Sequence, residues 1–523
     1  MTTRLPRRAL LAAPLAAPFV GRAAYAGGRL VVAADSEPSN LNPAIIASNG
    51  VFFVASKVIE PLAEAGYSGL EPRLATGWQA AADGRSISFS LRPGVKWHDG
   101  QDFSSADVAF SALEVWKKLQ NLGRAVFRDL EAVETPDGLT AVLRFSAPTP
   151  PSLIRNALPA LTSVLPKHLF AGTDIMKNPA NLQLVGTGPF RHVEYKRGEY
   201  HLLRRNPSYW GKGQPGLDEI LFRTLPDRAA AANALEAGDI QLAAFSAVPL
   251  SDLARIGKVS GLKVYTSGYE ALTYQLTVEI NHRTPVLADV RVRQAIAHAI
   301  DRGFVTKTIF LDTAEAAFGP IPPFDQAFHD ATAVLPGFDV ARANALLDAA
   351  GHPRGAGGVR FRLRLLPAPF FNESKQFGDY LRQALAAVGI DAVIAANDTP
   401  AHLKAVYTDH AFDLAVGTPV YRGDPAISTT VLFQSGLPSG VPFTNQYGYA
   451  NAEADRLIGA AARSVDDLER ASLYRALQRV VVKDVALINV ANFSFTTVAS
   501  TRVGNVSNNP RWATSGWADT TLS

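Results

Sequence analysis

Apolar and polar residues alternate over several short stretches, which is the pattern of a β-strand with one buried face. In residues 86–92, "SISFSLR", the apolar positions on one face are Ile87, Phe89 and Leu91. In residues 359–366, "VRFRLRLL", they are Val359, Phe361, Leu363 and Leu365. We predict a strand over each stretch.

Other stretches repeat apolar residues with helical spacing. Over residues 289–303, one helical face collects Val292, Ala295, Ile296, Ala299 and Ile300. Asp289 is the expected N-cap of this helix and Gly303 its expected C-terminal stop. Residues 454–484 predict two helices with a break near Ser464. Strands interspersed with helices indicate an α/β protein with mixed sheets.

Residues 94–108, "GVKWHDGQDFSSADV", suggest a metal or catalytic site because His98, Asp99, Asp102 and Asp107 fall within ten positions. Local geometry favours a structural explanation. Asp99-Gly100 is a strong turn dipeptide, and Ser104 with Asp107 forms a capping box for a helix that runs on through "VAFSALEVW". We therefore predict a strand, a turn and a capped helix here.

Catalytic motifs receive little support elsewhere. The sequence contains neither H-E-x-x-H nor G-x-S-x-G, and the S-x-x-K pattern at Ser260 and Lys263 lacks its companion motifs. Residues 186–189, "GTGP", lack the lysine of a phosphate-binding loop. We predict no catalytic residue, no metal site and no cofactor, and a secreted hydrolase (peptidase or amidase) remains the alternative from another functional class.

The chain has 523 residues, of which 47% are hydrophobic and 19% charged. This length predicts two or three domains, and no apolar run is long enough to span a bilayer, so we expect a soluble globular protein. Residues 1–26 have the features of a signal peptide: Arg4, Arg7 and Arg8 precede a short apolar stretch, and Ala24-Tyr25-Ala26 predicts cleavage before residue 27. General secretion and twin-arginine export both remain open.

Cleavage there removes four arginines and leaves 47 basic and 47 acidic residues, so the mature chain carries no formal net charge. This balance predicts no nucleic-acid partner. The sequence contains no cysteine, which excludes disulfides, thiol catalysis and a lipid-anchoring cysteine. A freely diffusing periplasmic protein fits these features.

Several segments, spread over nearly the whole mature chain, together resemble the family 5 solute-binding proteins of peptide/nickel-type ABC importers, which include the dipeptide- and oligopeptide-binding proteins. The matching residues are 30–44, 71–111, 185–223, 235–242, 289–301, 346–353, 412–425 and 470–488.

The resemblance implies a two-lobed, hinged periplasmic-binding-protein fold (type II, cluster C) with a subdomain inserted in lobe one. The expected bounds are 27–272 with 495–523 for lobe one, about 80–185 for the insert, and 273–494 for lobe two, with crossing strands near 272–281 and 487–495. It also implies a non-enzymatic monomer that binds a small solute and delivers it to the permease subunits of an ABC importer.

In this family the ligand lies between the lobes, so the resemblance implies that four segments contribute to the site. The expected ligand-binding residues are Glu37, Ser39 and Asn40; Tyr274 and Gln275; Phe370, Phe371 and Lys375; and Thr418, Tyr421 and Arg422. The aromatic members suit a cleft that stacks on apolar parts of a ligand.

Residues 418–425, "TPVYRGDP", are where we expect specificity to be decided. Dipeptide-binding members of the family carry an acid at the position of Tyr421, where it holds the ammonium group of the peptide. Arg422 could instead bind a carboxylate or phosphate, point to solvent, or pair with Asp424. Asp424-Pro425 is expected to shape a turn. The sequence thus predicts a peptide or amino-acid-derived solute, with an anionic opine or sugar conjugate as the alternative.

Overall fold

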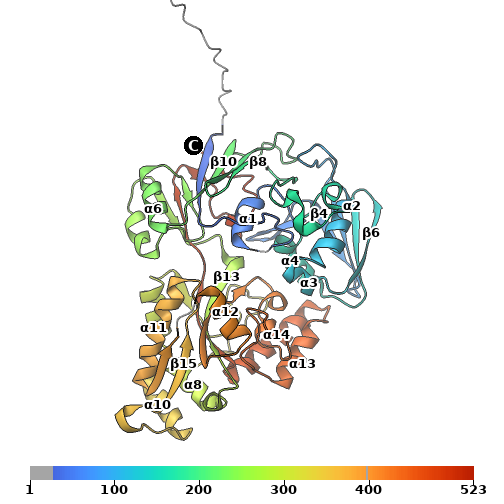
Figure 1. The fold of residues 1–523 in the computed structure, drawn as a ribbon. Coiled ribbons are helices and arrows are strands. Elements are labelled where there is room, and N and C mark those ends of the chain that lie inside the picture. The colour runs from blue at the N-terminus through green and yellow to red at the C-terminus, as the bar shows by residue number, and fades with distance from the viewer. Residues whose placement is uncertain (1–26, 47, 396–397) are drawn as a thin grey trace, which may run out of the picture.

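The computed structural model describes residues 27–46, 48–395 and 398–523. They form a mixed α/β protein with two lobes (Figure 1). The predicted signal peptide at 1–26 lies outside the described residues. Within these ranges, no helix combines the length and the apolar character needed to cross a bilayer.

Lobe one is built on a seven-stranded mixed sheet in which β1 is parallel to both of its neighbours. The spatial order is β12 (Leu262–Tyr265), β20 (Thr497–Ser500), β11 (Leu242–Ala243), β1 (Arg29–Ala34), β10 (Glu219–Thr224), β9 (Tyr200–Arg205) and β8 (Phe190–Lys196). Because side chains alternate along β1, Val32 shares a core with Phe53 of α1 (Asn49–Ala55), whereas Ala33 shares one with Ala231 of α6 (Arg228–Ala237).

A separate four-stranded antiparallel sheet lies beside this one. Its order is β4 (Ala75–Ala80), β5 (Ser86–Leu91), β7 (Thr140–Phe145) and β6 (Leu130–Asp137). The predicted strand at 86–92 is β5, and its three apolar residues are buried as expected. The helices that accompany the sheet are α2 (Ser105–Phe110), a π-helix (Ser111–Trp116), α3 (Asn121–Val126), α4 (Pro151–Leu161) and α5 (Lys167–Phe170).

The predicted capping box is confirmed at the start of α2, where the backbone N–H of Ser104 donates to Asp107 at 2.9 Å. The predicted turn is confirmed as well. Gly100 has φ +93°, and the N–H of Gln101 donates to Asp99 at 3.2 Å.

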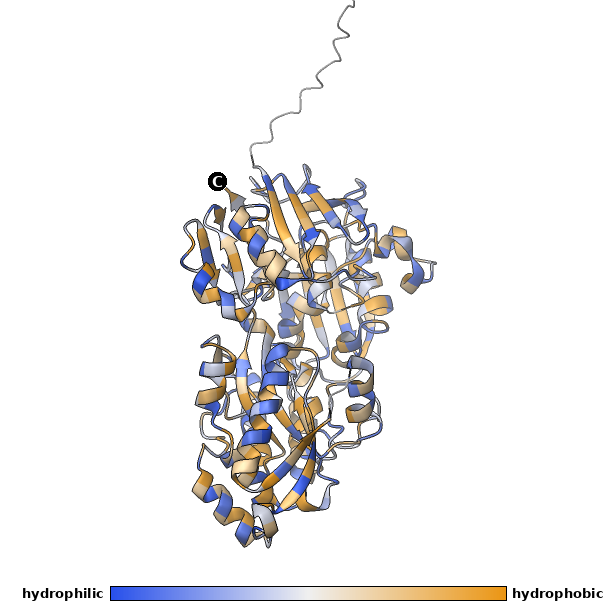
Figure 2. Cartoon of the chain, turned by 60° about the vertical axis from the view of Figure 1, so that its left-hand side comes forward, coloured by the Kyte–Doolittle hydropathy of each residue, from blue (hydrophilic) through white to orange (hydrophobic). Residues whose placement is uncertain are grey.

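Lobe two is built on a second seven-stranded sheet. Its order is β14 (Ala314–Ala316), β19 (Leu487–Phe493), β13 (Thr273–Ile280), β17 (Leu414–Gly417), β15 (Phe361–Leu366) and β16 (Ile390–Ile394), with β18 (Val420–Tyr421) also paired to β13. The helices of lobe two are α8 (Val290–His298), α9 (Arg302–Phe304), α10 (Val340–Ala349), α11 (Asn372–Ala387), α12 (Thr399–Tyr407), α13 (Ala452–Ala461) and α14 (Asp467–Lys483). In Figure 2 the helices and strands of this lobe carry both hydrophobic and hydrophilic residues along their length.

Three predictions in lobe two differ in outcome. Asp289 caps α8, and α13 and α14 flank Ser464, as predicted. The role predicted for Gly303 is wrong, because α8 ends at His298 and Asp301 accepts from the N–H of Phe304 at 3.0 Å to begin α9. The strand predicted over 359–366 begins only at Phe361, and Val359 is 44% exposed.

The chain passes between the two large sheets twice, over 266–272 and over 494–496. The two passages lie next to each other because β12 pairs with β20 in lobe one and β13 pairs with β19 in lobe two. On the side of lobe one, Tyr269 of the first passage is hydrogen-bonded to the strand that follows the second. Its hydroxyl accepts from the N–H of Phe245 at 3.0 Å and lies 2.6 Å from the hydroxyl of Thr497.

Candidate functional site

A cavity of about 230 Å³ lies between the lobes, beside the two crossings. Lobe two contributes three aromatic residues to its wall, and lobe one contributes the end of β1 with the loop that follows, the start of α1 and the start of α6. We call it the interlobe cavity, and its lining residues are Ala34, Asp35, Ser36, Asn49, Gly50, Phe53, Arg228, Phe245, Tyr274, Phe370, Phe371 and Phe495.

Tyr274 is central to the aromatic wall of the interlobe cavity. Its ring centroid lies 5.3 Å from that of Phe371 and 5.2 Å from that of Phe495, both edge-to-face. Its hydroxyl accepts from the Asn49 side-chain amide at 3.1 Å, a contact that joins the lobes. Burial raises the pKa of the Tyr274 hydroxyl, whereas the positive charge of Arg422 and the hydrogen bond from Asn49 oppose this shift. The wall therefore combines apolar rings with a neutral hydroxyl.

Three of the predicted site residues, Tyr274, Phe370 and Phe371, line the cavity. Gln275 is directed elsewhere, because neighbouring residues on a strand face opposite sides of the sheet. Its amide donates to Asn492 at 3.1 Å in the interior of lobe two. Thr418 is buried just before Pro419, whose carbonyl accepts from the N–H of Gln275 at 2.9 Å.

The loop after β1 reaches the cavity with Asp35 and Ser36 rather than with the later residues predicted. Glu37 accepts hydrogen bonds from the Tyr195 hydroxyl and from the N–H of Gly198, and these bonds lower the pKa of its carboxyl. Asn40 accepts from the N–H of Asn42 at 2.7 Å, and Ser39 is exposed. These predicted residues shape the loop and its contact with the turn between β8 and β9.

The segment 418–425 makes contacts that the sequence did not indicate. Tyr421 is buried and donates to Asp325. Asp424 does not pair with Arg422. It forms a fully buried ion pair with Arg470 at 2.7 Å, and it also accepts from the N–H of Ala426 at 2.9 Å, which shapes the predicted turn. Arg422 itself is partly buried, and burial lowers its pKa.

Lys375, the remaining predicted residue, is exposed on α11 and is not among the residues that line the cavity. Sequence reasoning missed most of the wall that lobe one supplies. Asp35 and Ser36 lie within the predicted loop segment, directly before Glu37, so the segment was chosen correctly and the residues within it were not. No local pattern marks Asn49, Phe53, Arg228, Phe245 or Phe495, because they come from four separate segments, of which α1 supplies the first two residues.

A second set of contacts joins the lobes away from the cavity, where α4 of lobe one faces α14 and the turn after β18 in lobe two (Figure 1). Asn156 donates to Asp424 at 2.9 Å, and Arg155 lies 2.5 Å from Asp467. Arg470 donates to the Ser152 hydroxyl at 3.1 Å. We call this the α4 contact, and its residues are Ser152, Arg155, Asn156, Asp424, Asp467 and Arg470.

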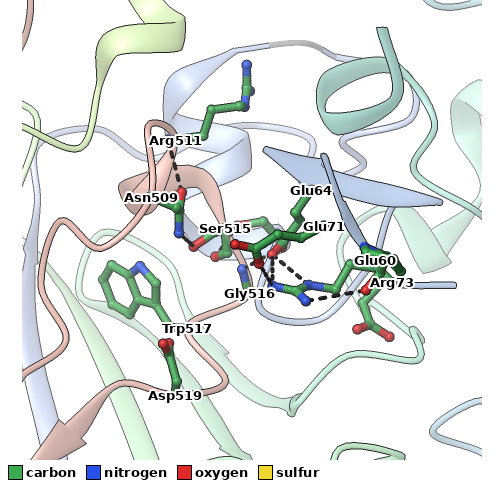
Figure 3. Close-up of polar contacts among 12 residues, drawn as sticks. Glu60, Glu64, Glu71, Arg73, Asn509, Arg511, Ser515, Gly516, Trp517 and Asp519 are labelled. Carbon is green, nitrogen blue, oxygen red and sulfur yellow. Dashed lines mark hydrogen bonds and ion pairs between the residues drawn. The ribbon is translucent and has the colours of Figure 1, made fainter. Parts of the chain in front are cut away.

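A smaller cavity of about 190 Å³ lies within lobe one, beside a network of carboxylates (Figure 3). Arg73 pairs there with Glu64 at 2.7 Å and with Glu71 at 3.1 Å. Glu60 accepts from the side chains of Thr187, Tyr209 and Trp210. Burial raises the pKa of Glu60 to about 7, although these hydrogen bonds oppose the shift. The polar groups of this network are bonded to one another and lie apart from the interlobe cavity.

The histidine and aspartates of 94–108 also have structural partners. His98 lies 3.0 Å from the carbonyl of Gly188, and burial lowers its pKa to about 4. His168 lies 2.6 Å from Asp99, and Lys96 lies 2.5 Å from Asp102. Across the residues that the structure describes, no cluster of histidines and carboxylates has the arrangement of a metal site.

Comparisons with known proteins agree with this architecture. The family described as "Bacterial extracellular solute-binding proteins, family 5 Middle" matches residues 69–439. Protein XP55 of Streptomyces lividans is 29% identical over 467 residues, covering 87% of this chain and 82% of XP55. The glutathione-binding protein GsiB of Salmonella typhi is 26% identical over 500 residues, covering 92% and 93%.

Among solved structures, the periplasmic binding protein AgaA from A. tumefaciens R10, in complex with agropinic acid, is 25% identical. The similarity covers 95% of this chain and 99% of AgaA, with a TM-score of 0.75. The predicted two-lobed periplasmic-binding-protein fold is thereby confirmed. The chain belongs to family 5 of the bacterial extracellular solute-binding proteins.

Proposed function

We propose that this protein is a periplasmic receptor that closes its two lobes around a small amino-acid-derived solute, a peptide or peptide-like molecule, and presents it to the permease subunits of an ABC importer. The observation that carries the proposal is the interlobe cavity, whose wall comes from both lobes at the crossings. A solute there contacts both lobes only when they are closed, so its binding energy favours the closed form.

The proposal includes the organisation of the chain. Lobe one comprises 27–272 and 495–523, with an inserted subdomain of about 80–185, and lobe two comprises 273–494. The crossings act as the hinge, and the protein acts as a monomer without catalytic activity. Its signal peptide is removed between residues 26 and 27 on export.

Different observations support a peptide-like solute and an opine or sugar conjugate. GsiB, named for glutathione binding, supports a peptide-like solute. AgaA, solved with agropinic acid, supports an opine or sugar conjugate. The contacts of Tyr421 also favour the second class, because its hydroxyl is bound to Asp325 and the position of the ammonium-binding acid supplies no charge to the cavity.

Mass spectrometry of solute released from the denatured periplasmic protein tests the proposal, followed by calorimetric titration of the solute found. We expect one solute per chain, and a melting temperature that rises with its concentration because only the folded protein binds it. If no solute is released, no peptide, opine or sugar conjugate raises the melting temperature, and the protein cleaves an ester or amide, then the hydrolase alternative is correct.

A further inference from the structure

Two arginines close to the crossings have no acidic partner among the residues that the structure describes. Arg422 follows β18 in lobe two, and Arg511 precedes the short 3₁₀ helix at Trp512–Thr514 in lobe one. Arg511 is only 6% exposed. Among the described residues, neither guanidinium forms an ion pair or donates a hydrogen bond, and Arg511 has only a cation–π contact with Phe52 of α1, at 5.8 Å from the ring centroid.

The two arginines flank the same short stretch of the first crossing. The N–H of Ala271 donates to the carbonyl of Pro510 at 3.1 Å, which brings the residue before Arg511 against the crossing. Two residues later, Thr273 pairs with Tyr421, the residue before Arg422. Consecutive Cα atoms are about 3.8 Å apart, so this pairing holds the two arginine segments close together. In agreement, burial and the charge of Arg422 lower the pKa of Arg511 to about 10.

Neighbouring carboxylates already have other partners. Glu270, next to Ala271 in the crossing, accepts from the N–H of Gly268 at 3.1 Å and from the Tyr67 hydroxyl at 3.2 Å. Asp424 pairs with Arg470, and Asp325 accepts from Tyr421. On the side of Arg511, Glu64 pairs with Arg73 and accepts from the N–H of Gly516 at 3.0 Å. Figure 3 shows the Arg511 side chain directed away from this carboxylate network. Within the described part of the chain, therefore, no carboxylate forms an ion pair with either guanidinium.

Two like charges near each other in a low-dielectric site are unfavourable unless an anion lies between them. A carboxylate satisfies both charges, since it accepts paired hydrogen bonds from guanidinium groups. Neither arginine lines the interlobe cavity itself, but each is close to a residue that does. Tyr274 pairs with Val420, two residues before Arg422, and Arg511 contacts Phe52, the neighbour of Phe53 in α1.

We propose that Arg422 and Arg511 together bind a carboxylate of the solute, with one guanidinium contributed by each lobe. The inference rests on the proposed receptor function and narrows its solute to an anion. Because the carboxylate bridges the lobes, it also favours closure. A neutral analogue of the same shape would leave the two cations unpaired in the closed form.

The first test needs no ligand and compares two buried arginines in solute-free protein. Arg470→Met removes a paired guanidinium and should lower the melting temperature by about 10 °C. Arg511→Met removes an unpaired one and should leave the melting temperature unchanged or raise it. A drop after Arg511→Met as large as that after Arg470→Met would overturn the inference, because it would show that Arg511 has an anionic partner within the protein.

The second test is calorimetric titration with matched probes: trialanine against trialaninamide, and glutathione against its diethyl ester. We expect the free acids to bind the wild-type protein ten- to a hundredfold more tightly, as charge-assisted hydrogen bonds predict. Arg422→Gln and Arg511→Gln should each reduce this preference to about threefold or less.

The outcomes separate the two proposals. Equal binding of acid and neutral probe overturns the arginine pair and leaves the receptor function intact. If none of the four probes binds, the solute released from the periplasmic protein decides: an anionic solute supports the pair, and a neutral or cationic solute overturns it. If no solute is released and none binds, the receptor function fails and the arginine pair fails with it.

Discussion

At the α4 contact, Asp424 and Arg470 are both fully buried and pair through hydrogen bonds of 2.7 and 2.8 Å, whereas beside the interlobe cavity Arg422 and Arg511 have no carboxylate partner among the described residues. Both regions join the same two lobes. In the first, the protein neutralises its own charges, so the contact needs no ligand. In the second, the carboxylate of the proposed solute would supply the missing negative charge.

Because of this difference, we expect substitutions in the two regions to change different properties of the protein. Substitutions at the α4 contact should mainly change the free energy of unfolding and the ease of closure. Substitutions at the interlobe cavity should mainly change solute affinity.

Arg470→Met should lower the free energy of unfolding by about 3–5 kcal/mol, because it leaves the buried Asp424 carboxylate without its counter-charge. Guanidinium denaturation followed by circular dichroism measures the effect. The double variant Asp424→Asn with Arg470→Met removes both charges and should recover most of the loss. A single variant as stable as the wild type would show that the pair contributes little, and the contrast between the regions would be lost.

The stability of the interlobe cavity wall should depend on pH through one buried histidine. His402 is buried, and its ring lies edge-to-face with Phe370 at 5.6 Å. Burial lowers its pKa from 6.5 to about 4. The fold therefore prefers the neutral imidazole, so the stability that depends on it is fully present above pH 6.5 and is lost as the pH falls toward 4.

The free energy of unfolding that the protein loses on acidification should be smaller in His402→Gln by about 3 kcal/mol, at about 1.4 kcal/mol per pKa unit. Denaturant titrations at several pH values between 7.5 and 4.5 measure the difference from the wild type. His98→Gln serves as the control in lobe one, because burial lowers the pKa of His98 to about 4 as well. Both variants should resist acid, and only His402→Gln should alter how solute affinity depends on pH. Parallel affinity profiles for the two variants would contradict a role for His402 in the wall.

The sequence predicted well what is decided locally. The capping box at Ser104, the cap at Asp289 and the buried face of β5 all depend on neighbours within a few residues. Gly303 shows the limit of such rules: a second cap at Asp301 restarted the helix, so a glycine that resembles a stop lies inside the next turn.

The candidate site was predictable only in part. Some of its residues lie in segments that the family resemblance marks, whereas others are brought there by contacts between distant parts of the chain. Tyr274, Phe370 and Phe371 come from segments that the family resemblance marks and line the cavity. For Gln275, strand alternation alone could have predicted a side chain that faces away from the cavity. The position of Arg511 depends on the contact between Pro510 and Ala271, which lie 239 positions apart in the chain, and no local rule anticipates such a contact.

Phe371→Ala should weaken solute binding at least about tenfold, or 1.4 kcal/mol, because the ring covers the cavity beside Tyr274. The solute released from the wild-type protein serves as the probe in calorimetric titration. Phe361→Ala is the matched control, since Phe361 is also partly buried in lobe two but packs on His352, away from the cavity. Equal losses of affinity in the two variants would mean that the wall acts only through the stability of lobe two.

The smallest effect is expected at the exposed edge of the α4 contact. The side chains of Arg155 and Asp467 lie 2.5 Å apart but are 35% and 51% exposed, so water and salt screen the pair. Arg155→Ala should therefore change the free energy of unfolding by less than about 1 kcal/mol. A double-mutant cycle with Asp467→Asn at low and high salt isolates the coupling energy, which should shrink as salt rises. A coupling energy of several kcal/mol that persists in salt would show that stabilisation extends over the whole α4 contact, whereas the structure confines it to the buried pair of Asp424 and Arg470.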